Sequence, residues 1–227
     1  MEQTQLNIGT RKIDVEIYAP SNQQPVAGIL LLHELFGLLD CYREDAADLA
    51  ERGYLVYLPD LFSGNPIRYC IRAMVTAAGM QNKSSNPLNQ EIHDLVDHLK
   101  ADPRCNGRLG ILGACLTGGF VLQMAKRDDM LAPVVYHHSL GLQGSGVPNN
   151  ESLDNVKVLQ GHWAKVDPLC PTSRRNKLQA QLGDRLERYE YNMPHGFRSV
   201  SRHLSDSKLV WERTLEFFDK HLVQTTS

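Results

Sequence analysis

A cysteine set among small residues is the strongest chemical signal in the chain. The segment Leu109–Gly119 reads LGILGACLTGG, so a short apolar run leads through Gly113 and Ala114 to Cys115 and then into a helix-like stretch. A sharp strand-to-helix turn needs small neighbours, because it crowds the positions two before and two after its central residue. Such a turn lifts the sulfur above a sheet and places it at a helix N-terminus, where thiolate is favoured over thiol. Cys115 is therefore predicted to be a nucleophile.

One position departs from this pattern. Thr117 stands two residues after Cys115, where the turn usually has glycine, and Gly118 and Gly119 follow it. No serine of the chain stands in a G-x-S-x-G context, so there is no rival nucleophile of that kind. The alternative interpretation is a buried structural cysteine followed by closely packed glycines.

Two later loops carry candidates for the residues that would activate a nucleophile. Asp167 lies in the run DPLCP after the apolar stretch Val156–Gly161, and His195 lies between proline and glycine in MPHGF. A carboxylate can fix the tautomer of a histidine, and a histidine on a tight loop can act as a base. Each signal is weak alone, because Asp-Pro is common in turns and loop histidines are common on surfaces. Their order, nucleophile then acid then histidine, is that of α/β-hydrolases.

A fourth loop, HELFG, follows the apolar stretch Val26–Leu32 and carries Glu34. In this architecture the loop after that strand and the residue after the nucleophile each donate a main-chain N–H to the oxyanion of the reaction. Leu35 and Leu116 are the residues so nominated. Glu34 itself has two interpretations at this stage, a solvated loop carboxylate or a charged group of the site.

The elements around these loops predict an α/β fold, with a mostly parallel central sheet and helices on both faces, in one domain covering residues 1–227. Continuous apolar runs such as Val26–Leu32 predict strands buried on both faces. The strands are expected at Arg11–Tyr18, Val26–Leu32, Tyr54–Leu58, Arg108–Leu112, Pro133–His137, Val156–Gly161 and Arg185–Tyr191. The helices are expected at Asp40–Arg52, Leu88–Lys100, Leu116–Lys126, Pro171–Leu182 and Leu204–Leu222, with a weaker helical pattern at Ile67–Ala78 and a candidate lid loop at Gly141–Ser152.

Composition excludes several classes of function. Charged residues make up 22% of the chain, the net charge is −2, and no basic stripe is present, which argues against binding to nucleic acid or to an anionic membrane. The N-terminus is polar, unlike a signal peptide, so a cytoplasmic protein with reduced thiols is expected. The cysteines have no CxxC spacing, and no metal site is indicated. They are Cys41, Cys70, Cys105, Cys115 and Cys170.

On these residues the chain resembles the dienelactone hydrolase (carboxymethylenebutenolidase) family of the α/β-hydrolase superfamily. The shared segments are His33–Gly37, Arg52–Tyr54, Pro59–Phe62, Gly113–Cys115, Asp167 and His195–Phe197. The resemblance implies hydrolysis of small-molecule esters or lactones through a Cys-His-Asp triad and a thioester, with no metal or organic cofactor. It also implies that Glu34 contacts the resting thiol and helps to activate it.

The resemblance further implies arginines that hold a substrate carboxylate. Arg198 and Arg202 follow the histidine, although their spacing does not match cleanly, and Arg72 or Arg68 is the candidate upstream. A guanidinium suits this task because it binds a carboxylate in a bidentate pair. The natural substrate stays open, as does the choice between monomer and homodimer.

Two functions from other classes stay possible from the sequence. One is a non-catalytic binding protein that keeps the fold, and the other is a thiol-based redox protein that uses Cys115. A complete set of triad residues argues against the first. The absence of a resolving cysteine near Cys115 in the sequence argues against the second.

Overall fold

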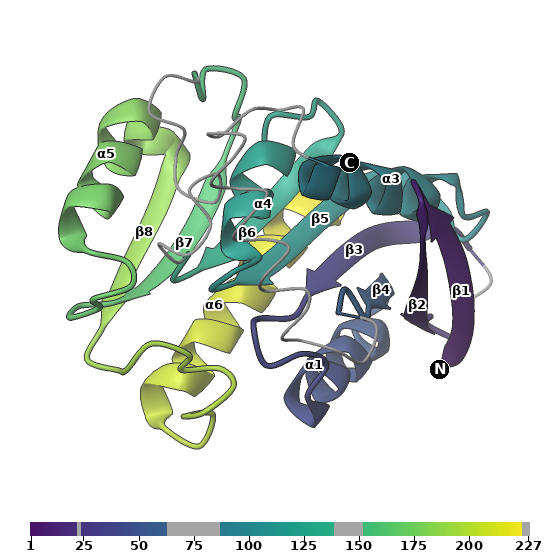
Figure 1. The fold of residues 1–227 in the computed structure, drawn as a ribbon, viewed down its shortest axis with the longest axis horizontal. Helices are drawn as coiled ribbons and strands as arrows, with labels where there is room; N and C mark the ends of the chain where they lie inside the picture. The colour runs from purple at the N-terminus through teal and green to yellow at the C-terminus, as the bar shows by residue number, and fades with distance from the viewer. Residues whose placement is uncertain (22–23, 63–86, 139–151, 224–227) are drawn as a thin grey trace.

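The structure, a computed structural model, describes residues 1–21, 24–62, 87–138 and 152–223. In this part of the chain, eight strands form one sheet in the order β1-β2-β4-β3-β5-β6-β7-β8 (Figure 1). The strands are β1 (Glu2–Ile8), β2 (Arg11–Tyr18), β3 (Val26–Leu32), β4 (Leu55–Pro59), β5 (Cys105–Ala114), β6 (Met130–Tyr136), β7 (Leu159–Ala164) and β8 (Leu186–Tyr191). The helices are α1 (Asp40–Glu51), α3 (Pro87–Ala101), α4 (Gly118–Met124), α5 (Thr172–Leu182) and α6 (Ser205–Leu222), with a 3₁₀ turn at Gly183–Arg185.

The sheet is parallel from β4 to β8, and β1 and β2 add an antiparallel edge. Strand β3 lies in its middle between β4 and β5, and its apolar run is buried on both faces, as the sequence predicted. The predicted α/β-hydrolase architecture is therefore confirmed. Because the parallel strands all end at one edge, the loops that follow them meet there.

Helices cover both faces of the sheet and enclose one apolar core on each face (Figure 1). Helices α3, α4 and α5 contribute Leu95, Val121 and Leu178 to one core. Helices α1 and α6 contribute Leu49 and Phe218 to the other. These two layers fix the sheet between them, so the loops at its carboxyl edge rest on a rigid support.

Strand β1 is the main element that the sequence analysis missed. Among the described strands it pairs with β2 alone, and most of its side chains are exposed, so its sequence lacks the apolar pattern of a buried strand. The predicted strand at Arg11–Tyr18 is β2, one strand in from the edge. Strand β7 begins at Leu159, three residues later than predicted. The predicted helical pattern at Ile67–Ala78 and the loop at Gly141–Ser152, except for Ser152, lie outside the described residues.

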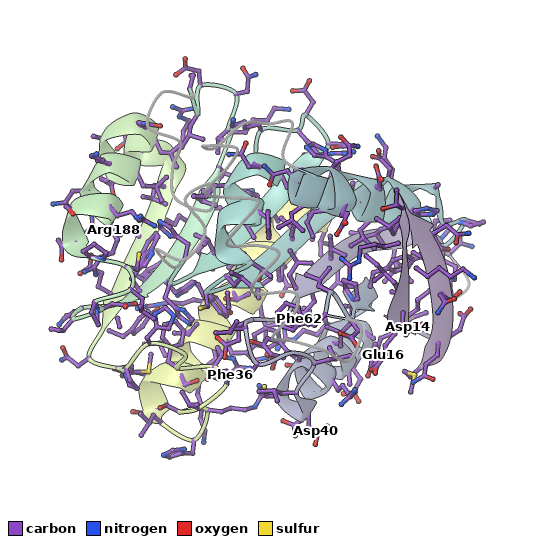
Figure 2. The ribbon with its side chains drawn as sticks, in the orientation of Figure 1. Asp14, Glu16, Phe36, Asp40, Phe62 and Arg188 are labelled. Carbon is purple, nitrogen blue, oxygen red and sulfur yellow. The ribbon has the colours of Figure 1, made fainter. Side chains whose placement is uncertain are left out.

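Charged side chains lie on both ends of the sheet, as Figure 2 shows for Asp14 and Glu16 on β2 and for Arg188 on β8. Within the described ranges, no helix combines the length and the apolar composition needed to cross a membrane.

Candidate active site

Cys115 occupies a strained turn between β5 and α4. Its φ is +52°, in the left-handed region that is costly for a residue with a side chain. Among the described non-glycine residues, only Cys115 and His137 have a positive φ. The main-chain N–H of Cys115 donates a hydrogen bond of 3.1 Å to the carbonyl oxygen of Tyr136 on β6. The neighbouring strand therefore holds the turn in its strained conformation.

The small residues around Cys115 are required by the packing of the turn. A Cβ atom on Gly113 would lie 2.8 Å from Cγ2 of Val121 and 2.9 Å from the carbonyl oxygen of Thr117. A Cβ atom on Gly118 would lie 3.0 Å from Cβ of His138. The contacts at Gly113 are too close for a side chain, and the contact at Gly118 is tight, so glycine at these positions permits the strand to turn directly into the helix.

Thr117 closes the turn through its hydroxyl group. Its Oγ1 accepts a hydrogen bond of 3.1 Å from the Ala114 N–H and donates one of 3.0 Å to the Ala114 carbonyl. The main-chain φ of Thr117 is −87°, so this position does not need glycine. The departure from the usual pattern thus replaces conformational freedom with two hydrogen bonds.

Asp167 and His195 form a hydrogen-bonded pair at the same edge of the sheet. Nδ1 of His195 lies 2.7 Å from Oδ2 of Asp167. The other oxygen, Oδ1, accepts hydrogen bonds from the main-chain N–H groups of Leu169 and Cys170, at 2.9 and 3.1 Å. The carboxylate is therefore fixed by its own loop while it orients the imidazole of His195.

The charges of this pair stabilise each other. Burial alone would raise the pKa of Asp167, but the hydrogen bond and charge of His195, together with the two N–H groups, lower it below its usual range. Burial opposes the charged form of His195, but Asp167 and the Cys115 thiol outweigh it and raise the pKa of His195 to about 9. Nε2 of His195 has no hydrogen-bond partner within the described residues. The pair therefore places Nε2 of a strongly basic imidazole beside the sulfur of Cys115.

Glu34 is buried beside this pair, so the solvated-loop interpretation of its carboxylate does not hold. Its side chain is 2% exposed, and its Oε1 has no hydrogen-bond partner in the described part of the chain. Burial raises the pKa of Glu34, and the Ser199 hydroxyl and the His195 imidazole offset part of this effect. A buried carboxylate without a full set of partners is costly and is typical of functional sites.

The loop that carries Glu34 is fixed at several points. His33 is completely buried; its Nδ1 lies 2.8 Å from the Glu34 carbonyl, and its Nε2 accepts a hydrogen bond of 3.1 Å from the Leu61 N–H. The Glu34 N–H donates to the Tyr42 hydroxyl at 3.2 Å, and the Gly37 N–H donates to the Glu34 carbonyl at 3.1 Å. These contacts leave the next residue, Leu35, in a defined turn.

The two leucines nominated as oxyanion donors have unused main-chain N–H groups. Neither the Leu35 nor the Leu116 N–H donates a hydrogen bond within the residues that the structure describes. Leu116 is buried directly after Cys115, and Leu35 is partly exposed directly after Glu34. Donors that have no partner in the resting protein are available to a developing oxyanion.

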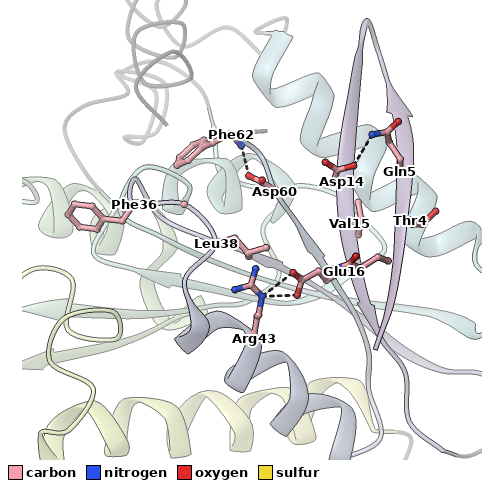
Figure 3. A pocket seen from close by; sticks show the side chains of 12 residues that line it. Thr4, Gln5, Asp14, Val15, Glu16, Phe36, Leu38, Arg43, Asp60 and Phe62 are labelled. Atoms are coloured by element: carbon pink, nitrogen blue, oxygen red, sulfur yellow. Dashed lines mark hydrogen bonds and ion pairs between the residues drawn. The ribbon is translucent and has the colours of Figure 1, made fainter. Parts of the chain in front are cut away.

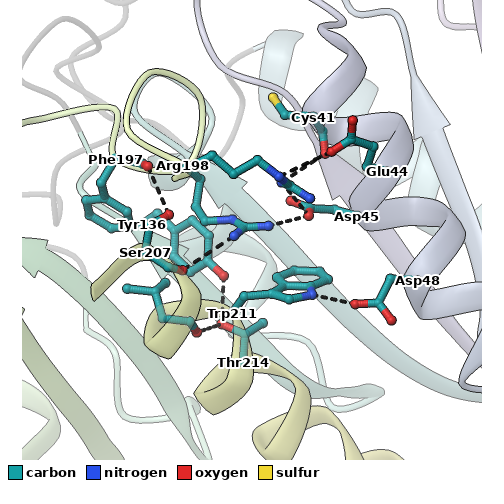
Figure 4. Close-up of polar contacts among 12 residues, drawn as sticks. Cys41, Glu44, Asp45, Asp48, Tyr136, Phe197, Arg198, Ser207, Trp211 and Thr214 are labelled. Carbon is teal, nitrogen blue, oxygen red and sulfur yellow. Dashed lines mark hydrogen bonds and ion pairs between the residues drawn. The ribbon is translucent and has the colours of Figure 1, made fainter. Parts of the chain in front are cut away.

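The arginines nominated as substrate anchors contact the protein itself. Asp45 of α1 binds Arg198 and also Arg202, the latter with a distance of 2.7 Å between Oδ1 and Nη1 (Figure 4). Arg198 is buried and lies over the ring of Trp211, with 4.8 Å from its Cζ to the ring centroid. A substrate-anchoring role for either arginine stays a prediction, and these contacts do not favour it. Arg72 and Arg68 lie outside the described residues.

This arginine cluster ties the loop of His195 to two helices. Arg198 donates to the Ser207 carbonyl at 3.4 Å, and the Ser207 hydroxyl donates to the Phe197 carbonyl at 3.0 Å. In Figure 4, Arg198 lies between Asp45 of α1 and Trp211 of α6. The cluster therefore fixes the main chain that begins two residues after His195.

Three residues of this region were not identified as functional from the sequence. Asp45 lies in an ordinary amphipathic helix, and Ser199 lies in a polar loop, so neither carries a signal without its partners. In the sequence, His137 is only the last residue of an expected strand. Its ring lies 4.2 Å from the ring of His195 between centroids.

A cleft of about 640 Å³ lies next to the loop after β3, between that loop and β1 and β2 (Figure 3). Its walls include the carboxylates of Asp14, Glu16 and Asp60, and Arg43 binds Glu16 at 3.0 Å. Neither Cys115 nor the Asp167–His195 pair lines it. Phe36 and Leu38 form part of its wall, so the cleft lies beside the loop that carries Glu34 and Leu35.

Comparison with known proteins identifies the family of the chain. The Dienelactone hydrolase family matches residues 13–222, which is most of the chain. The chain belongs to the dienelactone hydrolase family. The dienelactone hydrolase-like character predicted from the sequence, that of an ester or lactone hydrolase, is confirmed by this match.

Individual relatives are distant but match along most of their length. A carboxymethylenebutenolidase of Rhodococcus opacus is 27% identical over 220 residues, covering 91% of this chain and 86% of the relative. The hydrolase pyvD of Aspergillus violaceofuscus (strain CBS 115571) is 23% identical, covering 92% and 88%. Among solved structures, m3DLH has a TM-score of 0.80 at 20% identity and covers 98% of both chains. A dienelactone hydrolase-like promiscuous phosphotriesterase from metagenomic libraries has a TM-score of 0.73 at 17% identity, covering 95% and 97%.

The Thr117 hydroxyl gives a first prediction. We expect Thr117→Val to lower the free energy of unfolding by about 1–3 kcal/mol, because the buried Ala114 N–H loses its acceptor. Thr117→Ser keeps the hydroxyl and is the matched control, with a smaller loss. Urea denaturation followed by circular dichroism measures both. Equal stability of Thr117→Val and wild type would show that the hydroxyl does not hold the turn.

The arginine cluster gives a second prediction. We expect Asp45→Asn to cost about 3–5 kcal/mol of stability, because it leaves the buried guanidinium of Arg198 without its counter-charge. The double variant Asp45→Asn/Arg198→Met removes both charges and should be more stable than the single variant. Urea denaturation of the two single variants and the double variant gives the coupling energy. Additive losses would contradict a buried ion pair between these residues.

Proposed function

We propose that the protein hydrolyses carboxylic ester or lactone bonds of small molecules, with Cys115 as nucleophile, His195 as base and Asp167 as the acid that orients it. The observation that carries this proposal is the strained turn at Cys115 beside a hydrogen-bonded Asp167–His195 pair. Strain of this kind is kept at a site where it has a use.

The first half of the reaction forms a thioester. The Cys115 sulfur gives its proton to Nε2 of His195 and attacks the carbonyl carbon, and the carbonyl π electrons move to oxygen. The N–H groups of Leu35 and Leu116 stabilise the resulting oxyanion. When the tetrahedral intermediate collapses, the C–O bond to the leaving group breaks, and the imidazolium of His195 protonates the departing oxygen.

The second half releases the acid. His195, neutral again, takes a proton from a water molecule, whose oxygen attacks the thioester carbonyl carbon. The carbon–sulfur bond breaks, the sulfur leaves as thiolate, and a carboxylic acid is released. Asp167 keeps Nδ1 of His195 protonated throughout, so that Nε2 faces the reacting atoms in both halves.

Glu34 is proposed to control the charge of the resting thiol. A buried carboxylate near His195 competes with a thiolate for the same imidazolium, and its negative charge repels the thiolate. The resting enzyme would thus keep Cys115 as a thiol until substrate displaces or neutralises this effect. Such control protects a reactive nucleophile from adventitious oxidation.

Apolar side chains next to the catalytic loops favour a small organic substrate. Leu35, Phe36, Val166 and Val200 are exposed, and each lies within five residues of Glu34, Asp167 or His195. The relatives named as carboxymethylenebutenolidase support a lactone in particular. A small-molecule ester or lactone with an apolar portion is therefore the proposed substrate class.

The triad gives the third prediction. We expect Cys115→Ala, His195→Ala and Asp167→Ala each to lower kcat for a small ester or lactone by a factor on the order of 10³ or more, because a triad acts as a unit. For the same reason, the double variant Cys115→Ala/His195→Ala should lose little more than either single variant. Asp184→Ala, an exposed carboxylate outside the site, is the control. Near-normal turnover in Asp167→Ala would remove Asp167 from the triad.

The Glu34 carboxylate gives the fourth prediction. We expect Glu34→Gln to make Cys115 react faster with iodoacetamide and to move the pH dependence of this alkylation to lower pH, because the substitution removes a negative charge near the sulfur. Mass spectrometry across a pH series identifies which cysteine is labelled. Cys170, buried with its pKa raised to about 12, should stay unlabelled in the native protein. An unchanged profile would exclude electrostatic control by Glu34, and preferential labelling of another cysteine would exclude Cys115 as the reactive thiol.

A further inference from the structure

His137 is a second histidine at the centre of the site. It directly follows Tyr136, whose carbonyl holds the Cys115 turn, and its own N–H donates a hydrogen bond of 2.8 Å to the His162 carbonyl. Its ring lies 4.2 Å from the His195 ring, tilted by 57°, and 4.7 Å from the Phe197 ring. It therefore packs directly against the proposed base.

The conformation and surroundings of His137 are costly. Its φ is +30°, a value that side chains disfavour, and it shares this strain only with Cys115 among the described non-glycine residues. Its side chain is fully buried, and neither ring nitrogen has a hydrogen-bond partner in the described part of the chain. A buried donor or acceptor without a partner destabilises the folded protein. A phenylalanine would fill the same space without this cost.

Two other histidines show that unpaired nitrogens are not general in this protein. His162 is equally buried, but its Nδ1 lies 2.9 Å from the Tyr191 hydroxyl and its Nε2 lies 2.8 Å from Oε1 of Gln160. Nδ1 of His138 accepts a hydrogen bond of 3.3 Å from Nε1 of Trp163. Among the described residues, His137 is the one histidine with both ring nitrogens buried and without a partner.

The groups around His137 keep it uncharged. Burial lowers the pKa of His137 far below its usual value, and the neighbouring charge of His195 lowers it further. Asp167 and the main chain of His137 itself oppose this effect, and His138 adds a smaller lowering. His195 itself faces Asp167, Cys115 and Glu34. Of the two imidazole rings, that of His195 takes up the proton, and that of His137 stays neutral beside it.

We propose that His137 is a positioning residue: its neutral imidazole packs against His195 and stabilises the protonated form that His195 adopts during the reaction. A neutral ring with a free lone pair attracts a cation in a low-dielectric site, and it does not compete with Asp167 for the proton on Nδ1. The cost of the unpaired nitrogens in the resting protein is offset when the charge develops. This role rests on the proposed function of His195 as base.

The role predicts a variant that is more stable and slower. His137→Phe keeps an aromatic ring against His195 but removes the dipole and both unpaired nitrogens. We expect its melting temperature to rise, its kcat to fall about tenfold and its KM to stay unchanged, because the lost interaction forms only with charged His195. The limb of the kcat/KM pH profile that reports loss of the charged imidazole should move to lower pH, because the substitution lowers the pKa of His195.

His162→Phe is the matched control. It replaces an equally buried, neutral histidine whose nitrogens are paired, so its melting temperature should fall and its pH profile should keep the wild-type limbs. Iodoacetamide labelling of Cys115 across pH needs no substrate and reports the same effect: its midpoint should move to higher pH in His137→Phe alone.

Unchanged kcat and an unchanged labelling profile in His137→Phe would overturn the proposal and make His137 a packing residue. If that variant loses stability as His162→Phe does, the argument from unpaired nitrogens is also overturned. Failure of the proposed function itself looks different, since Cys115→Ala would then retain hydrolysis whatever His137→Phe does.

Discussion

The left-handed backbone at Cys115 is the constraint on which the rest of the site depends. A single residue in this conformation is unfavourable, and it persists because β5 and β6 hold the turn from one side while the Thr117 hydroxyl closes it from the other. The glycines at 113 and 118 let the strand and helix approach closely enough for this. The sulfur therefore lies at the edge of the sheet where strands β3, β6, β7 and β8 also end.

Electrostatics then complements this geometry. Asp167 raises the pKa of His195 and burial raises that of Glu34, whereas the pKa values of Asp167 and His137 are lowered, so four titratable groups in one small region are shifted in opposite directions. Placing groups of opposed tendencies together is how a fold makes acid and base chemistry possible at neutral pH. The buried ion pair of Asp45 and Arg198 fixes the loop that carries His195 and so stabilises this arrangement.

Sequence reasoning succeeded where local pattern and tertiary role coincide. The apolar run of β3 predicts a strand buried on both faces, and the small residues around Cys115 predict a crowded turn. Each environment restricts the residue types that fit, so the sequence carries the signal. It failed for β1, whose exposed edge position leaves no pattern, and for Asp45, whose role depends on a partner 153 residues away. His137 was visible as a residue after a strand, but its strain and its unpaired nitrogens exist only in the folded chain.

The most direct measurement of the central claim is the detection of the covalent intermediate. An activated aryl ester would be mixed with the protein, quenched in acid within milliseconds, digested and analysed by mass spectrometry. The account predicts an acyl group on the peptide that contains Cys115, removed by hydroxylamine as a thioester is and absent from Cys115→Ala. Steady hydrolysis without any acylated Cys115, or an acyl group attached to another residue, would contradict it.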